Sequence, residues 1–414
     1  MIRDVLLVQK RELETRLSEK YVDRNIRLKL DNNLVKIIIG PRRAGKSFAA
    51  MHALSAVGNF GYVNFDDERL IELKNYDEIV DAINSIYSNP KYLLLDEVQN
   101  LEKWELFVNR LQRQGYNLVV TGSNSKLLSK ELATHLTGRH LLTTILPFSF
   151  KEFLENGEKE TTGSEAHEQV LTYLSNGGYP EPLIKKIEYR EYLSTLLLSI
   201  IYKDIVKRFK IRQSQAIENL AKYLISNVAR EFSYNTLCQV TQCKSSHTVQ
   251  KYLGYLEETF LIFKLNRFSL KVKEQITSSK KIYCTDNGFI GAIAFSPNID
   301  MGKLLENSVA IELKKRELNN LANIFYWKNQ QGEEVDFLVM QGNKVSQLIQ
   351  VCYSLEDPKT KQREIRALLK ASAELKCNNL LIITDNYEAE TQEEWFGIKG
   401  KVKYTPLYKW LKEQ

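Results

Sequence analysis

The stretch that decides the fold is KIIIGPRRAGKS, residues 36–47, in which an apolar run breaks into a loop before a helix opens at Phe48. The loop has the G-x-x-x-x-G-K-S spacing of a phosphate-binding P-loop. Gly40 and Gly45 allow the tight turn that points successive amide N–H groups at phosphate oxygens, and the helix adds its positive end. A chance turn rich in Gly and Lys is the alternative, but the strand and the helix that the motif requires are both present.

The residue types of the loop predict separate roles. Lys46 is expected to reach the β- and γ-phosphates as a point charge, and the Ser47 hydroxyl to ligate a bridging Mg²⁺ ion. The motif therefore predicts ATP and Mg²⁺ as ligands. The predicted nucleotide-binding residues are Gly40, Pro41, Arg42, Arg43, Ala44, Gly45, Lys46, Ser47 and Phe48.

A second apolar run, Tyr92–Leu95, ends in the carboxylates Asp96 and Glu97 about 50 residues after the P-loop. This form is typical of a buried parallel strand that carries its chemistry at the carboxyl end. Asp96 is predicted to hold the magnesium ion through water, and Glu97 to polarise the water that attacks the γ-phosphate. An acidic turn after a core strand is the other interpretation.

Two later positions are candidates for sensing or stabilising the γ-phosphate. A third buried strand runs from Asn117 and ends at Ser123 and Asn124, where either side chain could sense the γ-phosphate or orient the water. The alternative is an ordinary strand-to-helix cap. Arg139 precedes the apolar stretch 140–146 and could stabilise transition-state charge in its own subunit or a neighbour's. A surface arginine that caps a helix end fits the same residues.

Composition limits the class of protein. With 414 residues the chain is expected to form two or three domains. Five scattered cysteines suggest neither disulfides nor a zinc site, so a reducing cytoplasm fits best. The longest apolar run is too short to span a membrane, and charges occupy the place of a signal-peptide core. We therefore expect a cytoplasmic protein with no membrane partner.

These motifs together resemble the bacterial and archaeal AAA-type ATPases related to the archaeal ATPase family. The resemblance is carried by 40–47, 94–97, 121–123, Gly138-Arg139 and PFSFKEF at 147–153. It implies an α/β P-loop NTPase core followed by a helical lid, a winged helix and a C-terminal α/β domain built like a restriction endonuclease. Proteins of this type commonly form rings, so a homo-oligomer ring is a further implication.

The predicted domains are 1–146 for the ATPase core, 147–212 for the lid, 213–285 for the winged helix and 286–414 for the C-terminal domain. Helical periodicity indicates the lid, interrupted at Gly177–Pro182. Three helical patterns and two strands then predict the winged helix. We expect ATP hydrolysis to move the lid relative to the winged helix and the C-terminal domain.

Positive charge is concentrated in the middle of the chain. Fifteen Lys or Arg and six Asp or Glu lie in 201–281, an excess of nine against +7 for the whole chain. Such a concentration indicates a binder of phosphate backbones, although a winged helix can also contact protein or act as a spacer. The predicted DNA contacts are Lys244, Ser245, Ser246, Thr248, Gln250 and Lys251 of the recognition helix, and Arg267, Lys271, Lys273, Lys280 and Lys281 on or near the wing.

The nuclease-like interpretation of the C-terminal domain depends on Glu306, Asp336, Gln350 and Cys352. A working PD-(D/E)xK site needs a carboxylate and a lysine where this chain has Gln350 and Cys352. Neutral glutamine is a poor ligand for a hard cation, and cysteine cannot take the cationic role. We expect an inactive scaffold or nucleic-acid platform.

The sequence thus predicts a magnesium-dependent ATPase that acts on or with DNA. A nucleotide-controlled protein-interaction or assembly switch is the alternative, and an ATP-gated nuclease is a third possibility.

Overall fold

The computed structural model describes residues 2–24, 28–70, 73, 75–123, 138–157, 161–293 and 300–414. The chain forms two compact units, one of residues 1–147 with 258–260 and the other of residues 148–257 with 261–414. The predicted boundary between core and lid lies one residue from this division, whereas the other two predicted boundaries fall inside the second unit. None of the helices in the described ranges combines the length and apolar composition needed to cross a membrane.

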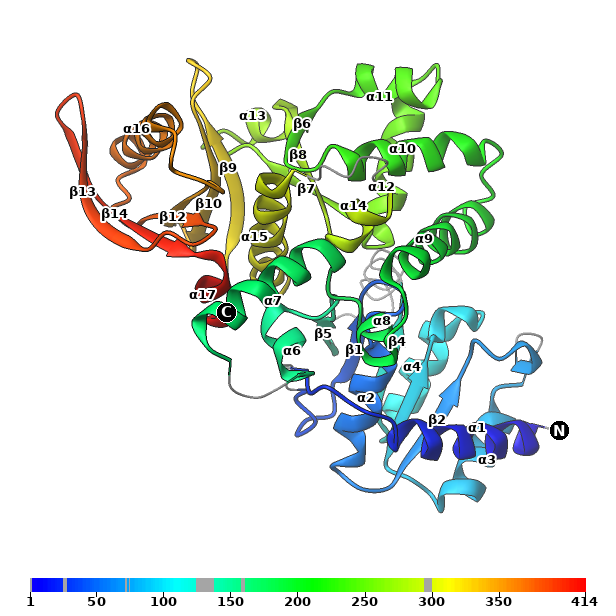
Figure 1. The fold of residues 1–414 in the computed structure, drawn as a ribbon. Helices are drawn as coiled ribbons and strands as arrows, with labels where there is room; N and C mark the ends of the chain where they lie inside the picture. The colour runs from blue at the N-terminus through cyan, green and yellow to red at the C-terminus, as the bar shows by residue number, and fades with distance from the viewer. Residues whose placement is uncertain are drawn as a thin grey trace. The chain divides into compact units, whose positions relative to one another are not determined.

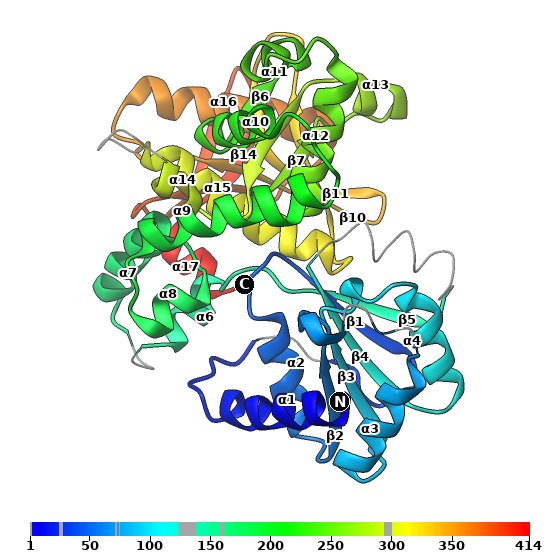
Figure 2. The ribbon, with the colours of Figure 1, turned by 90° about the vertical axis from the view of Figure 1, so that its right-hand side faces the viewer.

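The first unit is built on a parallel five-stranded sheet, shown with its flanking helices in Figure 2. The strand order is β2-β3-β4-β1-β5, and each neighbouring pair runs parallel. The central strands are buried apolar runs, as expected of a sheet covered on both faces. The predicted α/β core is therefore confirmed. The strands are β1 (Val35–Ile39), β2 (Phe60–Asn64), β3 (Tyr92–Asp96), β4 (Asn117–Gly122) and β5 (His140–Thr144).

The helices of this unit are α1 (Ile2–Leu17), α2 (Lys46–Ser55), α3 (Asp77–Tyr87) and α4 (Trp104–Arg113), with short 3-10 turns at Glu68–Leu70 and Val98–Asn100. Helix α1 packs against β2 and α3. Its buried Gln9 donates to the Asn64 carbonyl at 3.1 Å and accepts from the Asn64 amide at 3.0 Å. Both backbone groups of Asn64, at the end of the edge strand β2, therefore have hydrogen-bond partners. The helix ends at Leu17.

The second unit begins with the helices predicted as a lid (Figure 1). Ser149 and Glu152 form a capping box at the start of α6, and Thr162 and Glu165 do the same for α7. A π-helix continues directly from α9. The elements are α6 (Phe150–Glu155), α7 (Gly163–Asn176), α8 (Pro180–Lys185), α9 (Tyr189–Ser199) and the π-helix η3 (Ile200–Lys207).

Three helices and a small antiparallel sheet follow. The three expected helices and both expected strands are present, and β6 adds a strand that was not predicted. The sheet order is β6-β8-β7, and the basic segment between β7 and β8 contains the short helix α13. The elements are α10 (Ser214–Ser226), β6 (Arg230–Phe232), α11 (Tyr234–Thr241), α12 (Ser246–Glu258), β7 (Ile262–Asn266), α13 (Val272–Thr277) and β8 (Lys280–Cys284).

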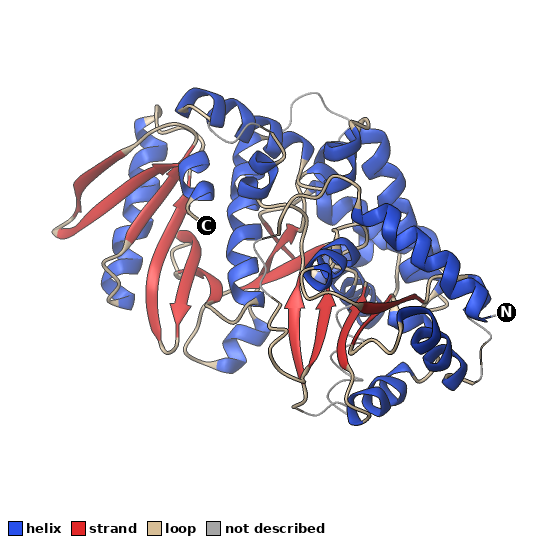
Figure 3. Ribbon diagram, turned by 90° about the horizontal axis from the view of Figure 1, so that it is seen from below, coloured by secondary structure: helices blue, strands red, loops and turns tan. Residues whose placement is uncertain are grey.

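The chain ends in a mixed six-stranded sheet of order β13-β14-β12-β11-β10-β9, with β13 and β14 forming a terminal hairpin (Figure 3). Trp410 is buried, at 5% exposure. The strands are β9 (Asn323–Lys328), β10 (Glu334–Gln341), β11 (Lys344–Val351), β12 (Leu380–Thr384), β13 (Ala389–Trp395) and β14 (Ile398–Pro406). The helices are α14 (Gly288–Ile293), α15 (Met301–Leu318), α16 (Pro358–Leu375) and α17 (Leu407–Lys412).

The lid helices are part of this second unit. The buried Asp286 accepts hydrogen bonds from the Gly178 amide at 2.7 Å and from the Gly288 amide at 2.9 Å. His167 of α7 lies 3.0 Å from the carboxylate of Asp385. These contacts place the lid helices in the same compact unit as the regions 213–285 and 286–414, and the motion of the lid relative to them stays a prediction.

Candidate nucleotide site and a second charged centre

The backbone of the P-loop requires its glycines. Gly40 has φ +152°, and a Cβ there would lie 1.9 Å from the Ile145 carbonyl oxygen, so no side chain fits. Gly45 directly precedes α2 in a left-handed conformation with φ 92°. Lys46 is buried, and its ammonium donates to the Pro41 carbonyl at 2.9 Å. The positive φ values of Gly40 and Gly45 give the tight turn that the sequence predicted at these two glycines, whereas the binding of phosphate by the loop stays a prediction.

Ser47 and Asp96 meet where β1 and β3 end. The Ser47 hydroxyl donates to Asp96 Oδ1 at 2.7 Å. Thr121 on β4 also donates to Oδ1, and Tyr62 on β2 donates to Oδ2 at 3.3 Å. Burial, followed by the charge of Glu97, raises the pKa of Asp96. Two residues predicted from separate motifs as metal ligands are therefore brought together, whereas Thr121 and Tyr62 were missed.

Glu97 follows Asp96 in a left-handed conformation, with φ 51°. Its carboxylate accepts a hydrogen bond from Gln99 Nε2, and the same amide lies 3.4 Å from Ser123 Oγ. Ser123, one of the two predicted sensors, is thus beside the predicted base. Asn124, the other, lies outside the described residues. Gln99 had no signal in the sequence beyond its nearness to the acidic pair.

Arg139 is at the opposite edge of the sheet. Its carbonyl accepts from the Val35 amide at 3.0 Å, and β5 runs parallel to β1 with His140 opposite Val35. The P-loop follows the other end of β1, four residues or about 13 Å away. The backbone of Arg139 therefore lies at the end of β1 that is far from the P-loop, and its role in stabilising transition-state charge stays a prediction.

A cavity of about 440 Å³ lies beside α2. Tyr21 stacks on His52 across a centroid distance of 3.8 Å. His52 Nε2 is buried and has no hydrogen-bond partner among the residues that the structure describes. Burial lowers the pKa of His52. The cavity is lined by Tyr21, Asp23, Arg24, Leu28, Ile38, Ala49, His52, Ala53 and Ile145.

Arg24 connects this cavity to the P-loop. It is 6% exposed and donates to the Ala44 carbonyl at 2.9 Å and the Leu146 carbonyl at 2.5 Å. These bonds tie the segment that follows α1 to the P-loop and to the chain just after β5. The sequence provided no motif for Arg24, Tyr21 or His52.

Comparison with known proteins agrees with this geometry. Residues 32–154 match the family described as an AAA domain. An uncharacterized protein of Methanocaldococcus jannaschii is 39% identical over 96% of this chain and 92% of its own length. The chain belongs to this family of AAA-domain proteins. Residues 167–299 and 301–408 match two domains of unknown function, DUF8612 and DUF4143.

Other similar proteins lie further from this chain. An uncharacterized protein of Haemophilus influenzae is 28% identical over 89% of this chain and 91% of its own length. Among solved structures, the Walker-type ATPase PABY2304 of Pyrococcus abyssi is similar over 69% of this chain and 95% of its own chain. The sequence identity is 15% and the TM-score is 0.44.

In this AAA-domain protein, the predicted DNA contacts differ in exposure. The exposed ones are Lys244, Ser245, Ser246, Gln250, Lys251, Lys271 and Lys273, and the half-buried ones are Thr248, Arg267 and Lys280. Arg267 donates to the Lys328 carbonyl, and Lys280 to the Ile276 carbonyl at 2.7 Å. Lys281 is 3% exposed and therefore is not accessible to DNA. The prediction of a DNA contact at Lys281 is wrong.

The buried Lys281 instead lies among carboxylates predicted for the nuclease-like site. Its Nζ is 3.0 Å from Glu306 Oε1, 3.0 Å from Asp336 Oδ1 and 2.7 Å from Glu334 Oε1. Burial opposes the charge of Lys281, but the surrounding carboxylates raise its pKa well above the ordinary value. Burial and the charge of Asp336 raise the pKa of Glu306 to about 7. Glu306 and Asp336 are therefore brought together, and Glu334 was missed.

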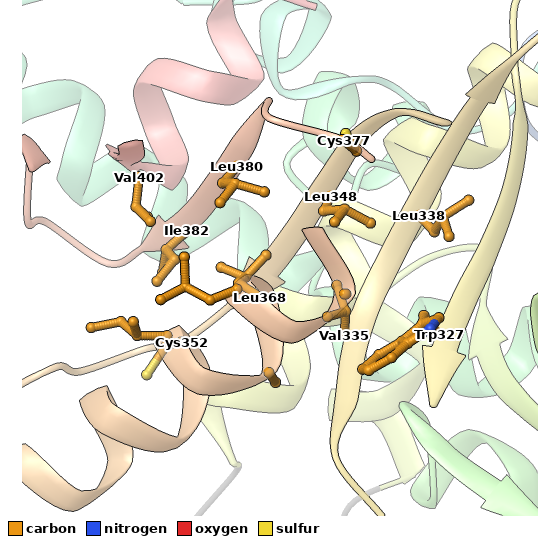
Figure 4. Close-up of a cluster of buried hydrophobic side chains, with 14 of the residues drawn as sticks. Trp327, Val335, Leu338, Leu348, Cys352, Leu368, Cys377, Leu380, Ile382 and Val402 are labelled. Atoms are coloured by element: carbon orange, nitrogen blue, oxygen red, sulfur yellow. The ribbon is translucent and has the colours of Figure 1, made fainter. Parts of the chain in front are cut away.

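The other two residues of that predicted site have different surroundings. Gln350 accepts from the Asp336 amide at 3.2 Å and donates to Glu364. Cys352 belongs to the apolar core of the C-terminal domain with Leu368 and Ile382 (Figure 4), and burial raises its pKa to about 11. Within the described ranges, no three His, Cys, Asp or Glu side chains are arranged to hold a metal ion.

Proposed function

We propose that the protein is a magnesium-dependent ATPase that acts on or with DNA. The observation that carries the catalytic part is the 2.7 Å hydrogen bond between Ser47 and Asp96, the two predicted metal ligands. Hydroxyl and carboxylate oxygens are the donors that Mg²⁺ prefers. When bound, Mg²⁺ would neutralise the charge that develops on the phosphates.

The remaining side chains then have distinct roles. Lys46 would leave the Pro41 carbonyl and donate to phosphate oxygens. Glu97 would accept a proton from the attacking water, and Gln99 holds its carboxylate in position. Thr121 and Tyr62 orient Asp96 from the neighbouring strands.

The cavity beside α2 is suited to the nucleotide base. It has room for a flat ring next to the stacked Tyr21 and His52, and a base nitrogen or amine would supply a partner for the orphaned His52 Nε2. Arg24 would link occupation of the cavity to the P-loop, because it holds the Ala44 carbonyl.

The DNA-binding part of the proposal assigns a winged helix to α10–β8. The order of three helices with a three-stranded antiparallel sheet supports this assignment. The start of α12 and the segment around α13 carry exposed Lys, Ser and Gln side chains, which can meet phosphates and base edges. Because the lid, this region and the C-terminal domain form one unit, we propose that nucleotide state acts on all three together.

The C-terminal domain is proposed as a scaffold rather than a nuclease. Gln350 and Cys352 are engaged in internal contacts, and Lys281 forms ion pairs with Glu306, Glu334 and Asp336. Because the backbone of Arg139 lies at the end of β1 away from the P-loop, we propose that Arg139 acts on the nucleotide of a neighbouring copy, and we keep a homo-oligomer as part of the proposal.

The test is ATP turnover with and without single-stranded, duplex and branched DNA. We expect Mg²⁺-dependent turnover that Lys46→Ala abolishes and that one form of DNA stimulates. Turnover unchanged by every form would remove DNA from the proposal and favour a nucleotide-controlled assembly switch, which a nucleotide-dependent change of mass would reveal. Absence of turnover in the parent protein would contradict the ATPase itself.

A further inference from the structure

Lys281 is surrounded as a bound cation would be. Three carboxylate oxygens, from Glu306 on α15 and from Glu334 and Asp336 on β10, lie 2.7 to 3.0 Å from its Nζ. The lysine itself comes from β8, a strand of the other sheet in this unit. Side chains from three elements therefore converge on one ammonium group, which is 3% exposed.

The lengths of these contacts distinguish an ammonium group from a metal. Charge-assisted N–H···O contacts measure about 2.7–2.9 Å. Oxygen ligands lie about 2.0–2.1 Å from Mg²⁺ and about 2.3–2.6 Å from Ca²⁺. The observed spacing of 2.7 to 3.0 Å fits the ammonium, and it explains why these acids do not form a metal-binding geometry as they stand.

The carboxylates are held in place by other contacts as well. Glu306 Oε1 also accepts from the Tyr283 hydroxyl at 2.7 Å. Asp336 Oδ2 accepts from the Val351 amide at 3.0 Å, and the second oxygen of Glu334 lies 3.3 Å from Lys328 Nζ. Each acid thus has at least one contact besides Lys281. Removal of the ammonium would leave a preformed set of three oxygens around one point.

We propose that Lys281 is the resident cation of this centre, and that it keeps closed a divalent-cation site made by Glu306, Glu334 and Asp336. The ammonium joins β8 to the C-terminal sheet without a metal. The parent protein then takes up no divalent cation at this centre. Replacing the ammonium with a neutral side chain opens the site to a hard divalent cation, with the oxygens moving inward by a few tenths of an ångström.

The experiment compares Lys281→Met with the parent in nucleotide-free full-length protein. Ser47 is alanine in every chain, so that the proposed magnesium site of the AAA domain does not contribute. The control is Lys328→Met, which removes a lysine from Glu334 without removing the central cation. Mn²⁺ binding is followed by electron paramagnetic resonance, and stability by thermal unfolding with and without Mn²⁺ or Ca²⁺.

We expect Lys281→Met to melt roughly 10 °C below the parent, because it leaves buried carboxylates without their counter-ion. It should bind one additional Mn²⁺ and recover most of the lost melting temperature in its presence, and adding Asp336→Asn should abolish this binding. The parent and Lys328→Met should not respond. A Lys281→Met chain that folds and gains no Mn²⁺ would overturn the proposal, as would Mn²⁺ binding in the parent that Asp336→Asn removes.

A measurement on the parent covers the case in which Lys281→Met does not fold even with cation. Lysine acylation followed by mass spectrometry should modify the exposed Lys273 readily and spare Lys281 in the native state. Equal modification of the two lysines would show that the ammonium is not held by the acids, and the proposal would fail.

Discussion

Ser47 Oγ lies 2.7 Å from Asp96 Oδ1, which connects the first turn of α2 to the carboxyl end of β3. The two residues are 49 positions apart, and each belongs to a different motif. Their contact turns two local patterns into one set of oxygen ligands at the edge of the parallel sheet.

Replacing Ser47 with alanine should therefore reduce ATP turnover by roughly 100-fold or more, because a metal ion contributes several kcal/mol of charge stabilisation. Steady-state phosphate release measures the effect. Ser55→Ala, at the exposed end of the same helix, is the control. Equal loss in both variants would indicate damage to α2 rather than loss of a ligand.

Glu97→Gln should slow hydrolysis by about 10²- to 10⁴-fold while nucleotide still binds, since the amide cannot accept the proton of the attacking water. Single-turnover hydrolysis and equilibrium binding of a fluorescent ATP analogue separate the two effects. A variant that loses binding as well as hydrolysis would contradict the role of Glu97 as a base.

Tyr21→Ala should weaken nucleotide affinity by about 5- to 150-fold, the range that follows from a lost base–aromatic stack of about 1–3 kcal/mol. The maximal turnover at saturating ATP should change little. Calorimetric titration gives the affinity, and Val57→Ala, exposed just beyond α2, serves as the matched control. Unchanged affinity in Tyr21→Ala would place the base outside the cavity.

Lys271→Ala combined with Lys273→Ala should weaken DNA binding uniformly across sequences. The slope of log K against log salt should decrease by about 2, because each phosphate contact contributes about 0.9. Nucleotide affinity should not change. The control replaces Lys399 and Lys401, exposed lysines of β14, and the same loss in this control would mean that binding follows net charge alone.

Asp286 predicts a pH dependence of stability. Burial raises its pKa to about 7, although the Gly178 and Gly288 amides oppose the shift. The folded protein therefore holds this proton more tightly than the unfolded chain, so the stabilisation is complete below about pH 4 and is lost as pH rises through 7. The free energy of unfolding should fall by on the order of 4 kcal/mol from the fully protonated to the fully ionised state of Asp286.

Urea unfolding at pH 5 and pH 8 measures this dependence. Asp286→Asn should flatten it, whatever the variant's stability at a single pH. Glu155→Gln, an exposed acid of the same unit, should leave it unchanged. If the stability of Asp286→Asn depends on pH as steeply as that of the parent, the proton responsible for the dependence belongs to another group.

Much of the AAA domain could be predicted from the sequence, because phosphate and metal chemistry restrict residue types at fixed local spacing. The turn at Gly40 and Gly45 and the acids at the end of the Tyr92–Asp96 strand are short-range patterns, and the observed strands follow the apolar runs. The alternation of strands and helices likewise reflects local periodicity.

Tertiary structure alone decided which distant residues meet. The parallel pairing of β5 with β1 moved Arg139 to the edge away from the P-loop, and strand order brought Thr121 and Tyr62 to Asp96. The sequence alone does not show whether a lysine side chain is exposed to water or buried in protein. Lys281 was therefore predicted to contact DNA together with its exposed neighbours, whereas the fold buries it against Glu306 and Asp336. Burial and charge pairing depend on elements that lie far apart in the chain.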